Sequence, residues 1–240
     1  MSAPARAPAE TQSVAPPTQP EPVSSIAAQY SGIAAEVYAP RRVDIALRAL
    51  DLLIAGTALI VLSPLLALLA LATLLTSGRP VLYRGERVGR AGRVFTMYKL
   101  RTLAPGAEAR LGNYYGEELS RRTEQEVTIV GRAARLTHID EVPQLFNVIR
   151  GDMSIVGPRP VRPAFFNRLC EEIPQYWQRL VVRPGVTGFA QTRITREDSW
   201  EDKLIHDLEY IADRSIRLYL RVLGATVARI ITLTFRGRAR

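Results

Sequence analysis

The longest apolar run of the chain covers residues 52–78 and carries no charged side chain. It exceeds the roughly 20 apolar residues that a helix needs to cross the hydrocarbon core of a bilayer. A helix that is apolar on every side has no polar face to turn toward water, which is unusual for a core helix in so small a domain. The pattern therefore predicts a membrane-inserted helix over residues 40–78.

Ser63 and Pro64 lie in the middle of this run. Proline removes a backbone donor and clashes with the preceding turn, so we expect a break here, with Ser63 satisfying a freed carbonyl. The halves on either side, 52–63 and 65–76, would each measure roughly 18 Å, about half of a bilayer. Arginines lie close to both ends of the run, and the positive-inside rule then places both ends in the cytoplasm. We predict a broken, re-entrant helix, and an ordinary kinked span is the alternative.

Beyond the apolar run the pattern changes to short β-prone segments and amphipathic helices. Residues 81–83 and 94–98 are β-prone and are separated by glycines, which is typical of a hairpin. Helical spacing recurs over 139–148, over 161–180 with a break at Pro174, and again from Trp200 to Ile211. We expect a mixed α/β, mainly helical fold: a monotopic membrane protein whose compact cytoplasmic domain, residues 79–240, has a short β-hairpin and amphipathic surface helices.

Residues 1–39 are rich in Ala, Pro, Ser, Thr and Gln and have few aliphatic side chains. They lack the apolar core of a signal peptide, so they are interpreted as a disordered tail outside the fold.

The chain has a formal net charge of +9 and a pI of about 10.2, which indicates an anionic partner. One cysteine and two histidines exclude an internal disulfide and argue against a zinc site, but they leave magnesium held by carboxylates open. After Asp213, arginines surround an apolar stretch that is typical of a membrane-surface helix. Nucleic acid is not an expected partner, because aromatic side chains for base stacking are scarce.

The chemistry concentrates between Arg135 and Pro160. Two adjacent carboxylates, Asp140 and Glu141, precede Pro143, and a stiff basic corner of sequence Pro-Arg-Pro ends at Pro160. Adjacent side chains point in different directions, so one carboxylate can face a reacting centre while the other faces Mg²⁺. An arginine fork such as that of Arg159 is a usual partner for phosphate. As an isolated pair, Asp-Glu is more simply interpreted as a solvated helix start. For the helix that follows, we expect an apolar face made by Val142, Leu145, Phe146 and Ile149.

A series of ordered motifs strongly resembles the bacterial sugar transferase family, the monotopic polyprenyl-phosphate hexose-1-phosphate transferases. The resemblance covers residues 41–235, and the matching pieces are Arg-Val-Asp at 42–44, Ser-Pro at 63–64, Gly-Glu-Arg-Val-Gly-Arg at 85–90, Tyr-Lys-Leu-Arg-Thr at 98–102, Ile-Asp-Glu-Val-Pro-Gln-Leu at 139–145, the block 147–160, Arg-Pro-Gly-Val-Thr-Gly at 183–188, and Trp200, Lys203, Asp207 and Tyr210. His138 and the segment 125–128 depart from the family pattern. The chain resembles the small form, which lacks extra transmembrane helices.

The resemblance implies that a sugar 1-phosphate moves from a nucleotide-diphosphate sugar, usually a UDP-sugar, to undecaprenyl phosphate in the bacterial inner membrane, with the catalytic domain on the cytoplasmic face. It implies Asp140 as the nucleophile that carries a phosphosugar, and Glu141 as a ligand of Mg²⁺. The further residues that it associates with the active site, as substrate or phosphate binders, are Lys99, Arg159 and Asp207, with Arg101 and Asp152 as additional candidates.

Two other hypotheses predict different behaviour. A magnesium-dependent aspartyl phosphotransferase or phosphatase would use Asp140 with water as acceptor and would need no membrane helix. A basic scaffold on anionic lipid would depend on the arginine-rich C-terminus and not on Asp140. The sequence names neither the sugar nor the glycan pathway, and it is compatible with a homodimer.

Overall fold

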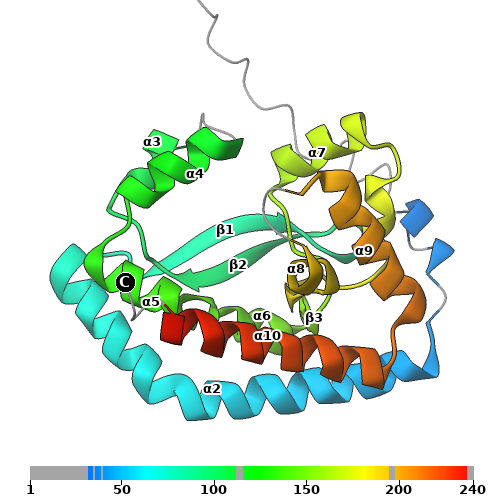
Figure 1. The fold of residues 1–240 in the computed structure, drawn as a ribbon, viewed down its shortest axis with the longest axis horizontal. Coiled ribbons are helices and arrows are strands. Elements are labelled where there is room, and N and C mark those ends of the chain that lie inside the picture. Colours follow the sequence, from blue (N-terminus) through cyan, green and yellow to red (C-terminus); the bar gives the residue numbers. More distant parts are fainter. Residues whose placement is uncertain (1–31, 35, 39, 112–115, 195–197, 237–240) are drawn as a thin grey trace, which may run out of the picture.

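The computed structural model describes residues 32–34, 36–38, 40–111, 116–194 and 198–236 (Figure 1). The predicted disordered segment 1–31 lies outside the described residues. Residues 32–38 were predicted to belong to the same tail, and for the described residues among them this is wrong. Ala34 is buried, and the Tyr38 hydroxyl donates to Asp44 at 2.8 Å. The Tyr38 ring also lies 3.9 Å from the guanidinium carbon of Arg90, a long-range contact that composition alone does not reveal.

Helix α2, Arg42–Ser77, contains the whole apolar run up to Ser77. The helix continues through Pro64 and is bent rather than interrupted (Figure 1), so the predicted break is a bend. Pro64 has no N–H to donate to the carbonyl of Ile60, and the Ser63 hydroxyl donates to that oxygen at 2.8 Å, as expected. Among the described residues, α2 is the helix long and apolar enough to cross a membrane, and only 6% of its most apolar window is buried. This exposure distinguishes it from the core helix of a soluble protein.

The predicted hairpin is confirmed as β1, Leu82–Val88, and β2, Val94–Leu100, joined through the short 3₁₀ helix η1, Arg90–Gly92. The strands are antiparallel, with Tyr83 opposite Lys99 and Arg87 opposite Phe95. Side chains alternate between the two faces of a strand, so these four residues share one face of the hairpin.

The next elements lead to the central carboxylates and the basic corner. They are α3 (Ala107–Leu111), α4 (Gly116–Gln125), α5 (Ile129–Leu136), the 3₁₀ helix η2 (Ile139–Glu141), α6 (Gln144–Arg150) and β3 (Ser154–Val156). Strand β3 pairs in parallel with β4, Gly185–Thr187. The backbones approach so closely that a Cβ on Gly185 would lie 2.1 Å from the nitrogen of Gly157. This contact requires glycine and fixes where the chain leaves β3.

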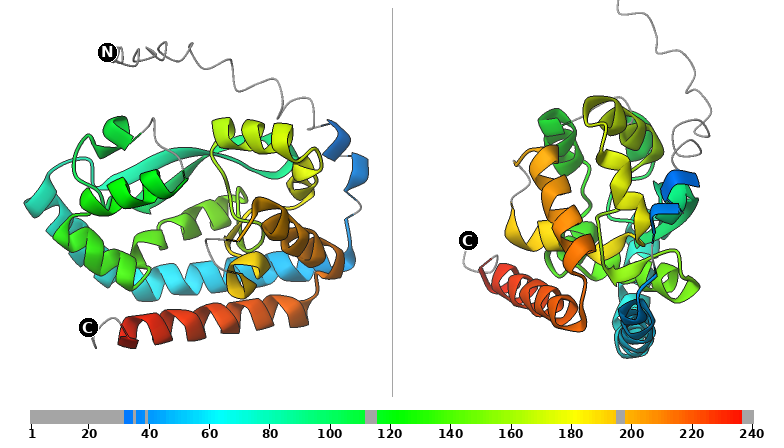
Figure 2. Two further views of the ribbon diagram at one scale, coloured as in Figure 1. Left: turned by 45° about the horizontal axis from the view of Figure 1, so that its top comes forward. Right: turned by 90° about the vertical axis from the view of Figure 1, so that its right-hand side faces the viewer.

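The remaining helices are α7 (Pro163–Glu172), η3 (Tyr176–Val181), α8 (Phe189–Arg193), α9 (Trp200–Asp213) and α10 (Ile216–Arg236). The break predicted at Pro174 is confirmed, because it separates α7 from η3. Helices α2 and α10 lie on one side of the molecule, whereas α3, α4 and α7 lie on the opposite side of the hairpin (Figures 1 and 2).

The core of the domain joins α2 to the segment that carries the central carboxylates. Its buried members include Met97 of β2, Leu145 and Val148 of α6, and Tyr219 of α10. Phe146 and Ile149 were predicted to belong to the buried face of α6, and this is wrong, because they are 51% and 40% exposed. The other two members of the predicted apolar face, Val142 and Leu145, are confirmed as buried, and Val148 completes the buried side of the short helix in place of Phe146 and Ile149.

Candidate active site

A short irregular segment presents the two central carboxylates. Helix α5 is capped by Thr128, whose hydroxyl accepts a hydrogen bond from the Gly131 nitrogen at 2.9 Å. After α5, His138 adopts a left-handed conformation with φ of 55°, which is uncommon for a residue other than glycine. This turn directs the chain into η2, where Asp140 is only 8% exposed. The two carboxylates therefore occupy a turn that precedes α6.

Glu141 is held by two cations from distant parts of the chain. The Lys99 Nζ donates to its Oε1 at 2.5 Å, and Nη2 of Arg159 lies 3.8 Å from the same oxygen. Burial alone would raise the pKa of Glu141, but the charges of Lys99 and Arg159 and the hydrogen bond from Lys99 outweigh it and lower this pKa to about 2. Glu141 is thus an anion throughout the physiological range.

Asp140 has the opposite electrostatic character. Burial, followed by the charge of Glu141, raises the pKa of Asp140 from its ordinary value, and the charges of Lys99, Arg135 and His138 oppose this effect. A carboxylate with a raised pKa is a stronger base than an ordinary one, and its oxygen lone pairs are therefore more available for reaction. The pair therefore combines a permanent anion with a more reactive neighbour, as expected for groups with different roles.

Asp207 is connected to this site indirectly, through Arg179 and the backbone of Arg159. It forms an ion pair of 2.8 Å with Arg179, and both side chains are 6% exposed. Arg179 also donates to the backbone carbonyl of Arg159 at 2.7 Å and to the hydroxyl of Tyr176. Asp207 therefore fixes the backbone of the basic corner through Arg179, and within the described part of the chain it forms no hydrogen bond or ion pair with Asp140 or Glu141.

Arg101 and Asp152 are placed elsewhere. The Arg101 guanidinium donates to the carbonyl oxygens of Ser77 and Gly78, at 2.7 and 2.8 Å, and so caps the C-terminal end of α2. Asp152 accepts a hydrogen bond from Asn147 at 3.3 Å and lies 3.5 Å from Arg150. The structure thus brings Lys99, Arg159, Asp140 and Glu141 together and gives Arg101 and Asp152 contacts at other points of the fold.

Two residues that sequence reasoning did not select also shape the site. Arg135, at the end of α5, contributes a positive charge that acts on Asp140 and donates to the Thr102 hydroxyl at 2.9 Å. Asn147 is fully buried, accepts from the Tyr98 nitrogen at 3.1 Å, and donates to the Thr96 carbonyl at 2.7 Å. It therefore clamps α6 to the strand that carries Lys99. A polar residue on the buried side of a short helix was the available signal for Asn147.

Side chains of the apolar helix α2 form hydrogen bonds with the end of α6 and with β3, the two segments on either side of Asp152. Arg48 of α2 donates to the carbonyl oxygens of Val148 and Ile149 at 2.7 and 3.0 Å. Asp51 is 2% exposed and its Oδ1 accepts from the Ser154 hydroxyl, the Ile155 nitrogen and the Tyr219 hydroxyl, at 2.8 to 2.9 Å. One helical turn of α2 thus positions the end of α6 and the strand that leads to Arg159.

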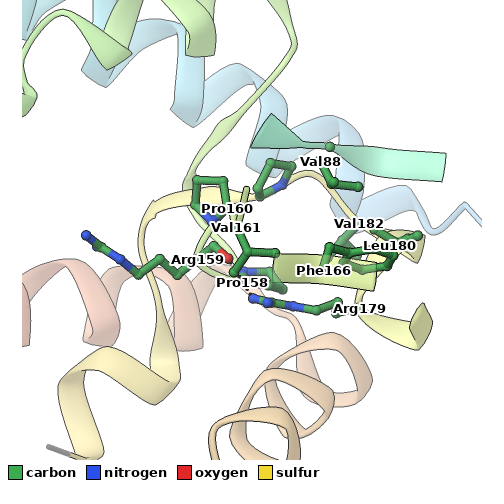
Figure 3. A pocket seen from close by; sticks show the side chains of 11 residues that line it. Val88, Pro158, Arg159, Pro160, Val161, Phe166, Arg179, Leu180 and Val182 are labelled. Atoms are coloured by element: carbon green, nitrogen blue, oxygen red, sulfur yellow. Dashed lines mark hydrogen bonds between the residues drawn. The ribbon is translucent and has the colours of Figure 1, made fainter. Parts of the chain in front are cut away.

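A small depression adjoins the basic corner. It is lined mainly by apolar side chains, among them Val88, Phe166, Leu180 and the two prolines of the corner, together with Arg179, and the Arg159 side chain points away from it (Figure 3). Its lining is largely apolar, so it supports the packing of the corner rather than forming part of the charged site.

The donor set can be tested against Mg²⁺, which needs few protein carboxylates when a diphosphate supplies the remaining oxygens. Both cations that contact Glu141 do so at Oε1, and within the described part of the chain no hydrogen bond reaches Oε2. No group of three or more metal-binding side chains occurs among the described residues. Among the described residues, Oε2 of Glu141 is therefore an oxygen that could hold a magnesium ion whose other ligands come from a bound diphosphate.

Residues 42–233 match the family model described as bacterial sugar transferase. The chain is 36% identical over 188 residues to an Aeromonas hydrophila UDP-N-acetylgalactosamine-undecaprenyl-phosphate N-acetylgalactosaminephosphotransferase, with 77% of this chain and 43% of that protein covered. It is 39% identical over 193 residues to an undecaprenyl-phosphate glucose phosphotransferase of Komagataeibacter xylinus, with 77% and 35% covered. For a UDP-glucose:undecaprenyl-phosphate glucose-1-phosphate transferase of Caulobacter vibrioides, the identity is 38% over 197 residues, with 79% and 71% covered.

The fold and the site thus define a membrane-associated protein with a charged carboxylate centre beside an apolar helix. The chain belongs to the bacterial sugar transferase family. It spans less than half the length of two of the three relatives described above, and about 71% of the third.

Proposed function

We propose that the chain is a phosphoglycosyl transferase that moves a sugar 1-phosphate from a nucleotide-diphosphate sugar, a UDP-sugar, to undecaprenyl phosphate. The observation that carries the proposal is the pair Asp140 and Glu141, one with a raised pKa and the other held ionised by Lys99 and Arg159. The names of the relatives support the acceptor and the type of reaction.

In the first step, an oxygen of the ionised Asp140 attacks the phosphorus that bears the sugar. The bond from this phosphorus to the bridging oxygen breaks, and the nucleoside monophosphate leaves with the electron pair. In the second step, an oxygen of undecaprenyl phosphate attacks the same phosphorus, and the bond to Asp140 breaks. This restores the carboxylate, and the lipid carries a sugar diphosphate; carboxylates are established covalent nucleophiles for phosphoryl groups.

The surrounding residues have separate tasks in these steps. Lys99 and Arg159 place positive charge beside the reacting phosphates while they orient Glu141. Asp207, through Arg179, holds the Arg159 backbone. Mg²⁺ held by Glu141 would neutralise charge on the diphosphate and on the leaving nucleotide.

The test is a transfer assay on the purified protein in nanodiscs. We expect release of UMP from at least one UDP-sugar in a panel, dependent on undecaprenyl phosphate and lost on addition of EDTA. The relatives are named for different sugars, so the panel identifies the donor. UMP release that proceeds equally without lipid would indicate a hydrolase, and no release with any donor, alongside intact lipid binding, would favour a scaffold.

We further propose that the domain lies on the cytoplasmic face of the bacterial inner membrane, with α2 entering and leaving on the same side. The bend of α2 (Figure 1), the proline within this helix, the arginines at both of its ends and the exposed apolar side chains of α2 and α10 support this arrangement. Arg101 holds the C-terminal end of α2 against the strand that bears Lys99.

Cysteine labelling tests the topology. The single native cysteine, Cys170, is buried, so cysteines introduced at Arg42 and Arg84 can be labelled selectively. In inverted vesicles, which expose the cytoplasmic face, we expect a membrane-impermeant maleimide to modify both positions equally. Labelling of one position only from each side would show a helix that spans the bilayer and would contradict re-entry.

A further inference from the structure

A group of arginines lies beyond the cations that bind Glu141. Arg87 is half-buried on β1, and Arg162 immediately precedes α7. Burial lowers the pKa of Arg87, and the neighbouring charges of Arg162 and Arg159 act in the same direction. Among the described residues, no carboxylate lies within 4.0 Å of the guanidinium of Arg87 or Arg162. The nearest acid is Glu108 of α3, on whose carboxylate the charges of Arg162 and Arg87 both act, so the two arginines share one acid and positive charge is in excess here.

Arg87 is held in place by an unusual packing of Tyr83. A Cβ on Gly85 would lie 2.0 Å from the Tyr83 hydroxyl, so this side chain lies along the strand in the space that glycine leaves open. Nη2 of Arg87 donates to that hydroxyl at 3.4 Å, and Nη1 donates to the Glu86 carbonyl at 2.6 Å. Tyr83 also hydrogen-bonds to Glu108 of α3. These contacts orient the guanidinium, and Glu108 balances only part of the combined charge of Arg87 and Arg162.

The position of this group relative to the carboxylates follows from the strand register. Tyr83 pairs with Lys99, and Arg87 lies on the same face of β1 as Tyr83. Lys99 binds Glu141, and Arg159 acts on both Glu141 and Arg87. The arginines therefore continue the cationic surface from the carboxylates outward along the hairpin.

We propose that Arg87 and Arg162 form a subsite for the phosphate of the leaving nucleotide, with Tyr83 over Gly85 as the device that positions Arg87. This inference rests on the proposed function. In the first step, the bridging oxygen takes the electron pair from the broken phosphorus–oxygen bond, and negative charge grows on the nucleoside phosphate. A fixed guanidinium beside that phosphate stabilises the charge in the transition state. The second step involves no nucleotide and does not use Arg87.

The two steps can be measured separately. Exchange of labelled UMP into a UDP-sugar, without lipid, reports the first step, and transfer from the preformed phosphosugar enzyme to undecaprenyl phosphate reports the second. We expect Arg87→Gln to slow exchange and weaken UMP binding by about 10- to 100-fold, the usual effect of losing a charged hydrogen bond. Transfer to lipid should change by less than about twofold, and Arg87→Lys should recover part of the exchange rate.

Arg84→Gln is the matched control, because it removes an arginine from the opposite, exposed face of the same strand. It should leave exchange and UMP affinity unchanged. Gly85→Ala is a second test that keeps the charge: its Cβ meets only the end of the Tyr83 side chain, which can move aside without unfolding the strand. When the Tyr83 side chain is displaced, Arg87 should lose its fixed orientation. UMP exchange should then be slower than in the wild-type protein, but by a smaller factor than in Arg87→Gln.

Unchanged exchange in Arg87→Gln, with an active wild-type protein, would overturn this subsite and leave the proposed function intact. Parallel loss of both steps, together with a lower melting temperature, would also overturn it, since that result defines a structural role. Absence of exchange in the wild-type protein would instead contradict the covalent mechanism itself.

Discussion

Replacement of Asp140 by asparagine is expected to reduce UMP release by at least roughly 10³-fold, because the amide cannot act as the covalent nucleophile. The substitution conserves shape and removes the repulsion between Asp140 and Glu141, so the protein should remain folded. Intact-mass analysis after mixing with donor should detect a phosphosugar adduct on the wild-type chain and none on the variant. Asp213→Asn, which alters an exposed acid of α9, is the control and should retain the adduct.

The pH dependence of the same first step provides a check on Asp140. Its raised pKa means that the reactive ionised form is lost, as the pH falls, at a higher pH than for an ordinary aspartate. Glu141, with a pKa of about 2, stays ionised over this range and cannot account for the change. Lys99→Met removes a cation that lowers the Asp140 pKa, so the acid limb should move to still higher pH. An acid limb at the ordinary aspartate value, or full activity in Asp140→Asn, would contradict the assignment.

Replacement of Asp207 by asparagine is expected to have the largest effect on stability. It leaves the guanidinium of Arg179 buried without its carboxylate, and breaking a buried pair in this way typically costs about 3–5 kcal/mol. Arg179 also holds the backbone of Arg159, so activity should fall even below the melting temperature. Thermal unfolding in detergent and the transfer assay at a lower temperature measure the two effects.

A double variant separates the effect of the buried ion pair on stability from the effect of Arg179 on the position of the Arg159 backbone. Arg179→Met with Asp207→Leu removes both buried charges, which can restore much of the stability lost in the single variant. It does not restore the donor to the Arg159 carbonyl, so activity should stay low. Asp213→Asn again serves as control, here on the same helix as Asp207. A single variant as stable as wild type would show that the pair is not buried in solution.

The bonds from α2 to the catalytic segments give the membrane helix a role beyond attachment. Arg48 and Asp51 contact the end of α6 and the start of β3, which carry the chain away from Asp140 and toward Arg159. Arg101 connects the other end of α2 to the strand of Lys99. The geometry of the site thus depends on the position of α2. If the proposed function holds, these bonds couple a reaction at a lipid phosphate to the helix proposed to enter the membrane.

Local sequence determined a large part of this protein. The uncharged run predicted the long apolar helix that the structure leaves exposed, and the chemistry of proline and serine explains the Ser63–Ile60 hydrogen bond. Alternating β-prone residues between glycines specified the hairpin, and the break at Pro174 followed from its missing N–H. The adjacent carboxylates and the basic corner were also visible, because each is contiguous in the chain.

Only the tertiary structure decided what the distant residues do. Arg101 lies two positions from Lys99, yet it caps α2 while Lys99 binds Glu141, because partners more than twenty residues away fix each side chain. Asp140 and Glu141 differ in pKa because burial and the cations of β2 and the basic corner act on them unequally. Asp207 acts through Arg179, and the Tyr38 contact brings the end of the predicted tail into the fold. Periodicity describes one segment at a time, whereas these contacts depend on which segments pack together.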